Sequence, residues 1–194
     1  MRKVVVVTGT PGVGKTSVAR LLAQRLKGAV LNLSEIVQSE GLSCGVDETR
    51  ATLVADTEKV ANRVRSAIAQ AEGYIIVEGH FASDVVAESD AFKVFVLRRD
   101  PDELRRVLVE RGFRESKVAE NVAAEILDVC LFDAVDAYGK DKVCEIDVSR
   151  KSLAEVVDQL TSVVEGRRKC RVGIVDWLTK LEMEKRLDDF LATV

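Results

Sequence analysis

The sequence predicts an α/β fold in which parallel β-strands form one sheet that helices cover on both faces. Short runs rich in valine and isoleucine alternate along the chain with longer segments of helical periodicity. The apolar runs carry few polar positions, as expected for strands buried on both faces. No internal repeat occurs, and only 2 prolines and 12 glycines among 194 residues leave little room for linkers. We therefore expect residues 1–194 to form a single domain.

Five strands and the helices between them account for most of the chain. Strands are expected at 3–8, 29–33, 74–77, 93–97 and 142–146. Helices are expected at 15–27, 34–38, 56–71, 101–111, 117–138, 152–164 and from 176 onward. Strands that alternate with helices in this way are typical of a parallel sheet, because each strand must return through a crossover connection.

Helix-capping residues support several of these boundaries. Gly28 stands just past the first helix, Ser34 is a candidate cap of the second, and Pro101 opens a later one. Ser152 and Glu155 have the spacing of a capping box. Between 39 and 52 the periodicity fades, which predicts an exposed excursion from the domain. The last helix, after a basic cluster at 167–171, is expected to pack on the domain; the alternative is a partner-binding tail.

Composition excludes several classes of protein. Lys and Arg total 29 against 32 Asp and Glu, whereas a protein that coats nucleic acid is usually basic, so we expect no DNA partner. No apolar run approaches the ~18–20 residues that span a membrane, and the run at 4–7 is too short for a signal peptide. Cysteines at 44, 130, 144 and 170 lack C-x-x-C spacing. We expect four free thiols in a cytoplasmic protein.

Residues 9–16, GTPGVGKT, match the phosphate-binding pattern G-x-x-x-x-G-K-[ST]. The motif follows a valine-rich strand and opens an amphipathic helix, which is the context that a phosphate-binding loop requires. Glycines allow the backbone amides to approach a polyphosphate closely. Lys15 would place a cation on the β and γ phosphates, and the hydroxyl of Thr16 can ligate Mg²⁺. Ser17 is either a donor to the α-phosphate or simply a residue of the first helical turn.

A second polar element follows the strand at 74–77. Glu78 ends that strand, where phosphate-loop proteins hold the water shell of Mg²⁺ or orient a nucleophile; strand ends also carry acidic residues for solubility alone. His80, the only histidine of the chain, comes two residues later. It could hydrogen-bond the waters of the metal or an attacking water, although a lone histidine is often structural.

A third element is rich in arginine. A kinase without a partner protein must supply its own arginine to the transferring phosphoryl group, and Arg111, beside the flexible Gly112, suits this role. Arg105 and Arg106 are expected instead to pair with acidic neighbours on a solvated helix face. The predicted catalytic residues are therefore Lys15, Glu78, His80 and Arg111.

Taken together, these elements resemble adenylate kinases of the isoenzyme-6 type, a family with archaeal members and with the eukaryotic nuclear ATPase that interacts with coilin. The resemblance runs from about 4 to 160. It is carried by VTGTPGVGKT at 7–16, VEGH at 77–80, VLR at 96–98, RGF at 111–113, EN at 120–121 and Glu125. Eukaryotic members carry Asp where this chain has Glu78, so the chain follows the archaeal pattern.

The resemblance implies a nucleoside-monophosphate-kinase core with an acceptor-binding segment near 32–56 and a lid near 110–120. The helical tail expected at 167–194 lies outside the match to the eukaryotic members. It implies that ATP contacts Gly12, Val13, Gly14, Lys15, Thr16, Ser17 and Arg111. The acceptor nucleotide would contact Asn32, Asp47, Arg50 and Asp56. Mg²⁺ would be held by Thr16 and, through water, by Glu78.

The implied activity is transfer of the γ-phosphate of ATP to AMP or another nucleoside monophosphate, accompanied by ATP hydrolysis. The resemblance also implies a role in maturation of the small ribosomal subunit, with a ribosomal protein and the pre-ribosomal particle as partners. Two alternatives stay open: an ATPase that acts mainly as an assembly factor, and a small-molecule kinase of the shikimate-kinase type. A guanine-nucleotide switch is disfavoured, because the chain lacks an N-K-x-D tetrad.

Overall fold

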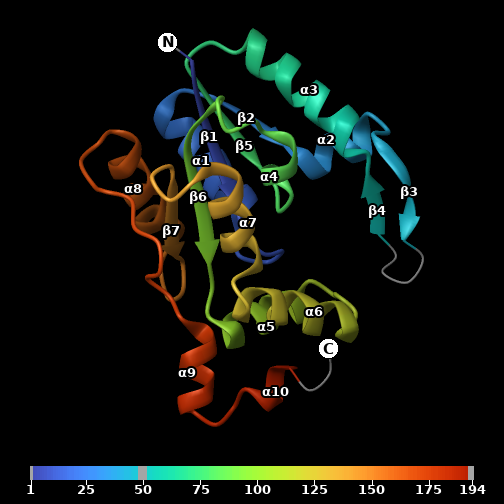
Figure 1. The fold of residues 1–194 in the computed structure, drawn as a ribbon, viewed down its shortest axis with the longest axis vertical. Helices are drawn as coiled ribbons and strands as arrows, with labels where there is room; N and C mark the ends of the chain where they lie inside the picture. The colour runs from blue at the N-terminus through green and yellow to red at the C-terminus, as the bar shows by residue number, and fades with distance from the viewer. Residues whose placement is uncertain (1, 48–51, 192–194) are drawn as a thin grey trace.

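The computed structural model describes residues 2–47 and 52–191. Five parallel strands form one sheet in the order β2-β5-β1-β6-β7 (Figure 1), which confirms the predicted fold class. The strands are β1 (Lys3–Thr8), β2 (Ala29–Asn32), β5 (Tyr74–Glu78), β6 (Ala91–Arg98) and β7 (Val143–Asp147).

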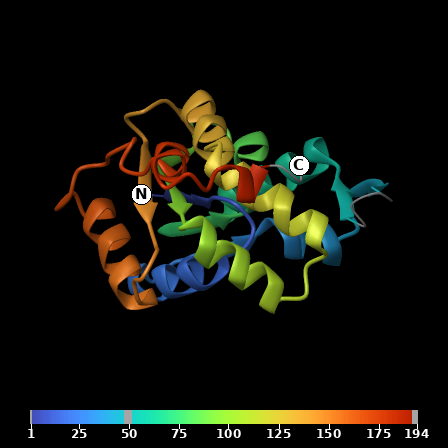
Figure 2. The ribbon, with the colours of Figure 1, turned by 90° about the horizontal axis from the view of Figure 1, so that it is seen from below.

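Two hydrophobic clusters cover the two faces of the sheet. Val5 and Val7 of β1 belong to one cluster, and Val4 and Val6 to the other, as the two-residue period of a strand requires. On the first face lie α1 (Lys15–Leu26), α5 (Pro101–Glu110), α6 (Glu115–Ile126) and α8 (Leu153–Val164). On the second lie α2 (Leu33–Ser39), α3 (Thr57–Gln70), α4 (Ala82–Val85) and α7 (Val129–Tyr138). Figure 2 shows α1 and α8 on one side of the sheet and α4 and α7 on the other.

Most predicted caps are present, with one correction. The capping box of Ser152 and Glu155 is formed, and Asp100 caps the helix that Pro101 begins. The second helix is capped by Asn32, whose Oδ1 accepts a hydrogen bond from the backbone N of Glu35 at 3.0 Å. The prediction that Ser34 caps this helix was wrong, because the helix already begins at residue 33.

The segment that lacked periodicity forms a hairpin. Strands β3 (Ser43–Asp47) and β4 (Thr52–Ala55) pair antiparallel, away from the main sheet. The described part of the excursion is therefore exposed, as expected, but it has regular structure. Val46, Leu53 and Val54 are 60%, 47% and 44% exposed, so neither face of the hairpin is fully covered.

The helix predicted at 117–138 is broken in two at Asp128, and a buried arginine explains the break. Asp128 has a φ of 58°, in the left-handed region. The guanidinium of Arg98 donates to the backbone oxygen of Glu125 at 2.8 Å and to the carboxylate of Asp128. It also pairs with the carboxylates of Glu125 and Glu145 at 2.8 and 2.7 Å. In a continuous helix the carbonyl of Glu125 would accept from residue 129, but here it accepts from Arg98 and, at 3.3 Å, from the backbone N of Asp128, and the chain turns.

The C-terminal segment packs on the domain, which confirms the preferred prediction, but as two short helices. These are α9 (Trp177–Met183), capped by Asp176, and α10 (Asp188–Leu191). Lys185, with a φ of 55°, separates them. Trp177, Leu181 and Phe190 belong to the same buried cluster as α5 and α6, and Figure 1 shows both helices next to α5 and α6.

Two of the four cysteines form a disulfide, which corrects the expectation of four free thiols. Cys144 on β7 is joined to Cys170, and Cys44 and Cys130 are free. The backbone N of Glu145 donates to the carbonyl of Arg171 at 2.8 Å, so the chain after α8 runs along β7 and brings the two sulfurs together. A separation of 26 residues gave no signal of this pairing.

No helix in residues 2–47 and 52–191 combines the length and the apolarity needed to cross a membrane.

Replacing Arg98 by Met is expected to lower the free energy of unfolding by about 3–5 kcal/mol, because Glu125 and Glu145 would stay buried without their cation. The matched control is Arg20→Met, which breaks an ion pair with Glu35 whose side chains are both 62% exposed and should cost less than ~1 kcal/mol. Denaturant unfolding of both variants measures the difference. Equal losses would contradict the assigned importance of the buried pair.

Candidate active site

The loop between β1 and α1 has the shape that a phosphate-binding loop needs. Gly9 and Gly12 have φ values of 134° and 97°. A Cβ on Gly9 would lie 2.5 Å from the carbonyl oxygen of Leu97, and one on Gly12 would lie 2.8 Å from Leu104. Both positions therefore require glycine. Val13 is 1% exposed and anchors the loop in the core, while the N-terminus of α1 opens toward the cavity described below.

Lys15 lies over this loop. Its Nζ donates to the carbonyl oxygens of Gly9 and Thr10 at 2.7 and 3.1 Å. Burial lowers the pKa of Lys15 and the charge of Arg111 adds to this effect, while Glu78 and Glu125 act in the opposite direction. An anion in the loop would offer this ammonium group a stronger partner than two carbonyls.

Glu78 and Thr16 meet beside the loop. The parallel register pairs Glu78 of β5 with Val7 of β1, so the carboxylate lies where β1 passes into the loop. Thr16 Oγ1 donates to Glu78 Oε1 at 2.8 Å. Burial raises the pKa of Glu78, and the hydrogen bond from Thr16 and the charge of Lys15 oppose that rise. A hydroxyl and a carboxylate so close together fit Mg²⁺, which prefers oxygen ligands.

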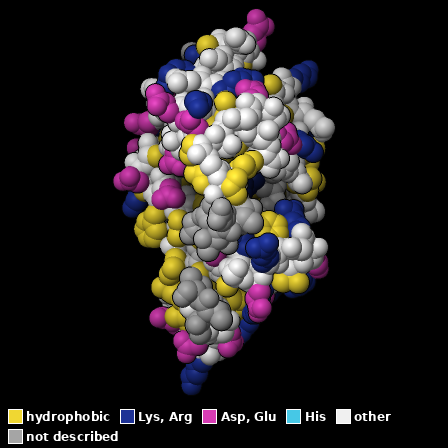
Figure 3. Space-filling model, turned by 90° about the vertical axis from the view of Figure 1, so that its right-hand side faces the viewer, with side chains coloured by type: hydrophobic (Ala, Val, Ile, Leu, Met, Phe, Trp, Pro, Cys, Tyr) yellow, Lys and Arg dark blue, Asp and Glu magenta, His cyan; other side chains and the backbone are white. Residues whose placement is uncertain are grey.

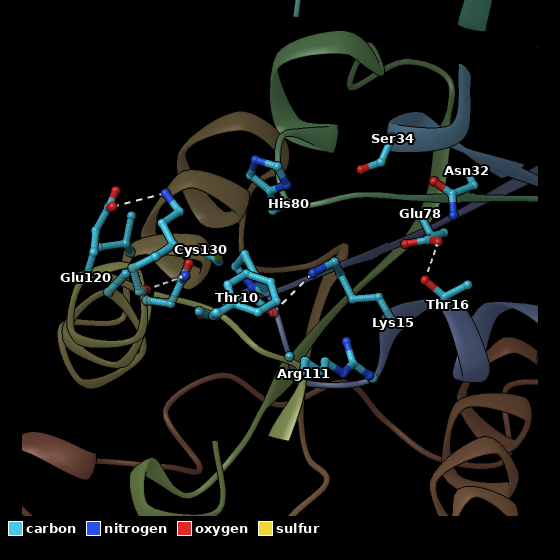
Figure 4. A pocket seen from close by; sticks show the side chains of 18 of the residues that line it. Thr10, Lys15, Thr16, Asn32, Ser34, Glu78, His80, Arg111, Glu120 and Cys130 are labelled. Carbon is cyan, nitrogen blue, oxygen red and sulfur yellow. Dashed lines mark hydrogen bonds and ion pairs between the residues drawn. The ribbon is translucent and has the colours of Figure 1, made fainter. Parts of the chain in front are cut away.

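His80 lies on the other side of Lys15. The residue is exposed on the wall of the cavity, but partial burial of the imidazole, together with the charges of Lys15 and Lys117, lowers the pKa of His80 to about 4. The imidazole is therefore neutral near pH 7 and can accept a hydrogen bond. Figure 4 shows Lys15 between His80 and Ser34 on one side and Arg111 on the other.

One cavity of about 740 Å³ brings these groups together, and its size is that of a small-molecule site. It is lined by all the predicted catalytic residues, Lys15, Glu78, His80 and Arg111, and by Gly12, Gly14, Thr16 and Ser17 of the predicted ATP site. The segment after α5 adds Phe113 and Lys117 to the wall. Gly112, with a φ of 75°, follows Arg111 directly.

The residues expected at the acceptor site are more scattered. Asn32 lines the cavity while it caps α2. Asp56 caps α3 and pairs with Lys59 at 2.8 Å. Asp47 ends β3, and its side chain, like the whole of Arg50, lies outside the described residues.

Sequence reasoning missed other side chains at that end of the cavity. Ser34 and Gln38 of α2 and Leu53 and Val54 of β4 all line it. The sequence feature that could have pointed to this part of the cavity is the apolar pair Leu53 and Val54 in an otherwise polar stretch.

Arg105 and Arg106 of α5 are exposed, as expected, but one of their expected partners is engaged elsewhere. Asp102, an expected partner of Arg105 and Arg106, forms its ion pair with Arg186 of the C-terminal segment at 2.7 Å. The guanidinium of Arg105 lies 5.9 Å from the ring centre of Phe190. The helix face therefore contacts the C-terminal segment and is not simply solvated.

The fold and the loop define the class: this is an α/β protein with a phosphate-binding loop and the fold of small P-loop kinases. A family model described as "AAA domain" matches residues 5–128. The chain is 41% identical over 177 residues to a "Putative adenylate kinase" of Natronomonas pharaonis, covering 91% of this chain and 99% of that protein. It is 39% identical over 171 residues to the protein of the same name from Methanothermobacter thermautotrophicus, covering 88% and 95%. The chain belongs to this archaeal adenylate-kinase-like family.

Solved structures agree on the fold. Shikimate kinase from Bacteroides thetaiotaomicron matches with a TM-score of 0.59 at 17% identity, covering 84% of this chain and 98% of that one. A gluconokinase from Sinorhizobium meliloti matches with a TM-score of 0.55 at 17% identity, covering 85% and 95%. At such identities the likeness concerns architecture alone.

The titration of His80 should have its midpoint near pH 4. The pKa lies below the ordinary value of 6.5, so the folded protein binds fewer protons than the unfolded chain between these pH values. The contribution of His80 to stability is complete above pH 6.5 and is lost as the pH falls toward 4. Because the chain has one histidine, NMR of its ring protons gives the midpoint directly. A midpoint at 6.5 would refute the lowered pKa.

Proposed function

We propose that this protein transfers the γ-phosphoryl group of ATP to a nucleoside monophosphate, with AMP as the first candidate. The observation that carries the proposal is that a single cavity connects the phosphate loop with the side chains of α2 and β4. Such a cavity can hold a donor and an acceptor with their phosphates facing each other. The names of the family members support adenosine nucleotides as substrates.

At the donor end, the amides of Gly12, Val13 and Gly14 would bind the β-phosphate, and the hydroxyl of Ser17 would donate to the α-phosphate. Lys15 would leave the carbonyls of Gly9 and Thr10 for the β and γ phosphates. Thr16 and, through water, Glu78 would hold Mg²⁺, which neutralises phosphate charge when bound. All of these contacts would strengthen as charge moves toward the leaving oxygen.

At the acceptor end, Ser34 and Gln38 offer hydrogen-bonding groups, and Leu53 and Val54 offer an apolar wall for a base. Asn32 lies between the two ends. The assignment of Asp47, Arg50 and Asp56 to the acceptor stays a prediction. Arg111, on the short segment between α5 and α6, would reach the phosphoryl group in transfer when that segment closes and excludes water.

Hydrolysis of ATP would accompany transfer. The neutral ring of His80 lines the cavity and can accept a hydrogen bond from a water. When no acceptor fills the cavity, that water would attack the γ-phosphate, so ATPase activity would fall as an acceptor binds. The shikimate-kinase alternative has support only from the shared fold.

The direct test follows ADP and inorganic phosphate separately with MgATP and a panel of nucleoside monophosphates. With AMP, two ADP should form for each ATP consumed, with little phosphate released. Lys15→Ala should lose turnover by at least about 10³-fold, because it loses the cation on the transferring phosphate, while its unfolding curve stays close to the wild-type curve. ATP consumption that no monophosphate changes would contradict the proposed transfer.

A role as a nucleotide-gated assembly factor is a second candidate. Its support is the exposed apolar side chains of Val46, Leu53 and Val54 on a hairpin that also borders the cavity. Figure 3 shows hydrophobic side chains gathered on the face of the molecule that carries this hairpin. A partner bound there would sense whether the cavity is filled. The partner implied by the resemblance is a small-subunit ribosomal protein.

Pulldown of purified small-subunit ribosomal proteins with and without ATP tests this second candidate. A partner that binds in one nucleotide state should bind at least about tenfold more weakly to a Val46→Ser, Leu53→Ser double variant, because the apolar contact area is lost. Val109→Ser, another exposed valine at 59%, is the control and should bind normally. If binding of the ribosomal proteins depended neither on ATP nor on the two hairpin substitutions, the role as an assembly factor would be excluded.

A further inference from the structure

A line of buried side-chain hydrogen bonds joins the C-terminal segment to the phosphate loop. Trp177 Nε1 of α9 donates to Glu125 Oε1 at 3.2 Å. The other oxygen of the same carboxylate, Oε2, accepts from Thr10 Oγ1 at 2.6 Å. Thr10 is the second residue of the phosphate loop. Only one carboxylate therefore separates the tail of the chain from the loop.

The carboxylate of Glu125 is built into this position. The residue is 1% exposed, and Oε1 also accepts from Arg98 Nε at 2.8 Å and from the backbone N of Arg99 at 3.0 Å. Four donors thus converge on two oxygens, which suits an ionised carboxylate because it only accepts. A carboxylate held in this way has little freedom to move, so it can fix the group that donates to it.

The group that it fixes is the start of the loop. Thr10 is 1% exposed, and its carbonyl accepts from the backbone N of Val13 at 3.3 Å and from Lys15 Nζ at 3.1 Å. A shift of Thr10 would therefore move both the turn of the loop and the resting place of the catalytic ammonium group. There is little free space beside Gly12 toward the core, because a Cβ built on it would lie 2.8 Å from Leu104 and 3.0 Å from Leu108.

The tail is held firmly on both sides of Trp177. Before it, the backbone N atoms of Gly173 and Ile174 donate to Glu145 Oε2, each at 2.8 Å. After it, Lys180 pairs with Asp100 at 2.7 Å. Trp177 itself is 8% exposed. The indole is thus placed against Glu125 by contacts that do not depend on the loop.

We propose that Glu125 and Trp177 are positioning residues of the ATP site, and that the segment after Gly166 is therefore part of the catalytic structure and not an appendage. This inference rests on the proposed ATP binding. By fixing Thr10, the two residues keep the loop amides in the arrangement that a triphosphate needs, so binding does not have to order the loop first. The family model ends at residue 128 and so does not include Trp177.

Four variants of the full chain separate this role from simple packing. Thr10→Val removes the hydroxyl at nearly constant shape, and Thr10→Ser retains it. Trp177→Phe removes the indole N–H but keeps an aromatic ring in the core. Phe190→Leu loosens the packing of the tail on α6 but removes none of the groups that donate hydrogen bonds to Glu125, and it serves as the matched control.

Calorimetric titration with Mg²⁺ and a non-hydrolysable ATP analogue gives the affinity of each variant. Thr10→Val should bind about tenfold more weakly, which corresponds to ~1.4 kcal/mol, and Trp177→Phe about threefold more weakly. Thr10→Ser and Phe190→Leu should bind like the wild type. In steady state, the KM for ATP should rise in the two affected variants, while the KM for the acceptor should not.

Trp177 also supplies a spectroscopic signal, because it is the only tryptophan of the chain. Binding of the analogue should change its fluorescence in the wild type and in Thr10→Ser, since phosphate charge in the loop would polarise the hydrogen bonds that Glu125 accepts from Thr10 and from the indole. In Thr10→Val that connection is cut, and at saturating analogue most of the change should disappear. A role limited to stability would leave this response intact.

Unchanged affinity in Trp177→Phe, or an equal loss in Phe190→Leu, would overturn the inference. So would a full fluorescence response in saturated Thr10→Val. Failure of the proposed function looks different: the wild type itself would then bind no ATP analogue.

Discussion

The buried ion pair between Arg98 and Glu125 links the end of β6 to the break between α6 and α7 and to the phosphate loop. The side chains of Arg98 and Glu125 are 2% and 1% exposed, so each would carry a large desolvation cost without the other. Their pairing is not a source of great stability by itself, because apolar residues of equal volume could pack as well. Instead, the pair fixes the positions of two chain segments. Arg98 binds Asp128, where a helix ends, and Glu125 accepts a hydrogen bond from Thr10 of the phosphate loop.

The carboxyl edge of three adjacent strands explains why the site lies where it does. β1 leads into the phosphate loop, β5 ends at Glu78 with His80 just beyond, and β6 ends at Arg98. Parallel strands point their carboxyl ends to one edge, so a single sheet brings all three contributions together. The loop can therefore turn tightly and still be stable, because neighbouring strands and helices pack against it.

The parts of the site that depend on local sequence could be predicted. The loop motif, the strand that ends in Glu78, and the position of Arg111 beside Gly112 all follow from residues that are close in sequence. They place Lys15, Glu78, His80 and Arg111 around one cavity, as expected. The strands of the sheet were predicted for the same reason, since an uninterrupted apolar run is a local signal.

What could not be predicted depends on contacts between distant residues. The break at Asp128 is caused by Arg98, 30 residues earlier, and helical periodicity carries no trace of it. The disulfide joins cysteines brought together by a chain segment that runs along β7. Ser34 and Gln38 look like ordinary polar helix residues, and only the fold turns them toward the cavity.

We propose that one cavity holds ATP and its acceptor end to end. Two adenosines joined through five phosphates form a molecule that would span both ends, and its binding can be followed by calorimetric titration. One such molecule should bind per chain, and its binding should exclude both the ATP analogue and AMP. An AMP affinity that stays unchanged when the joined molecule is bound would contradict it.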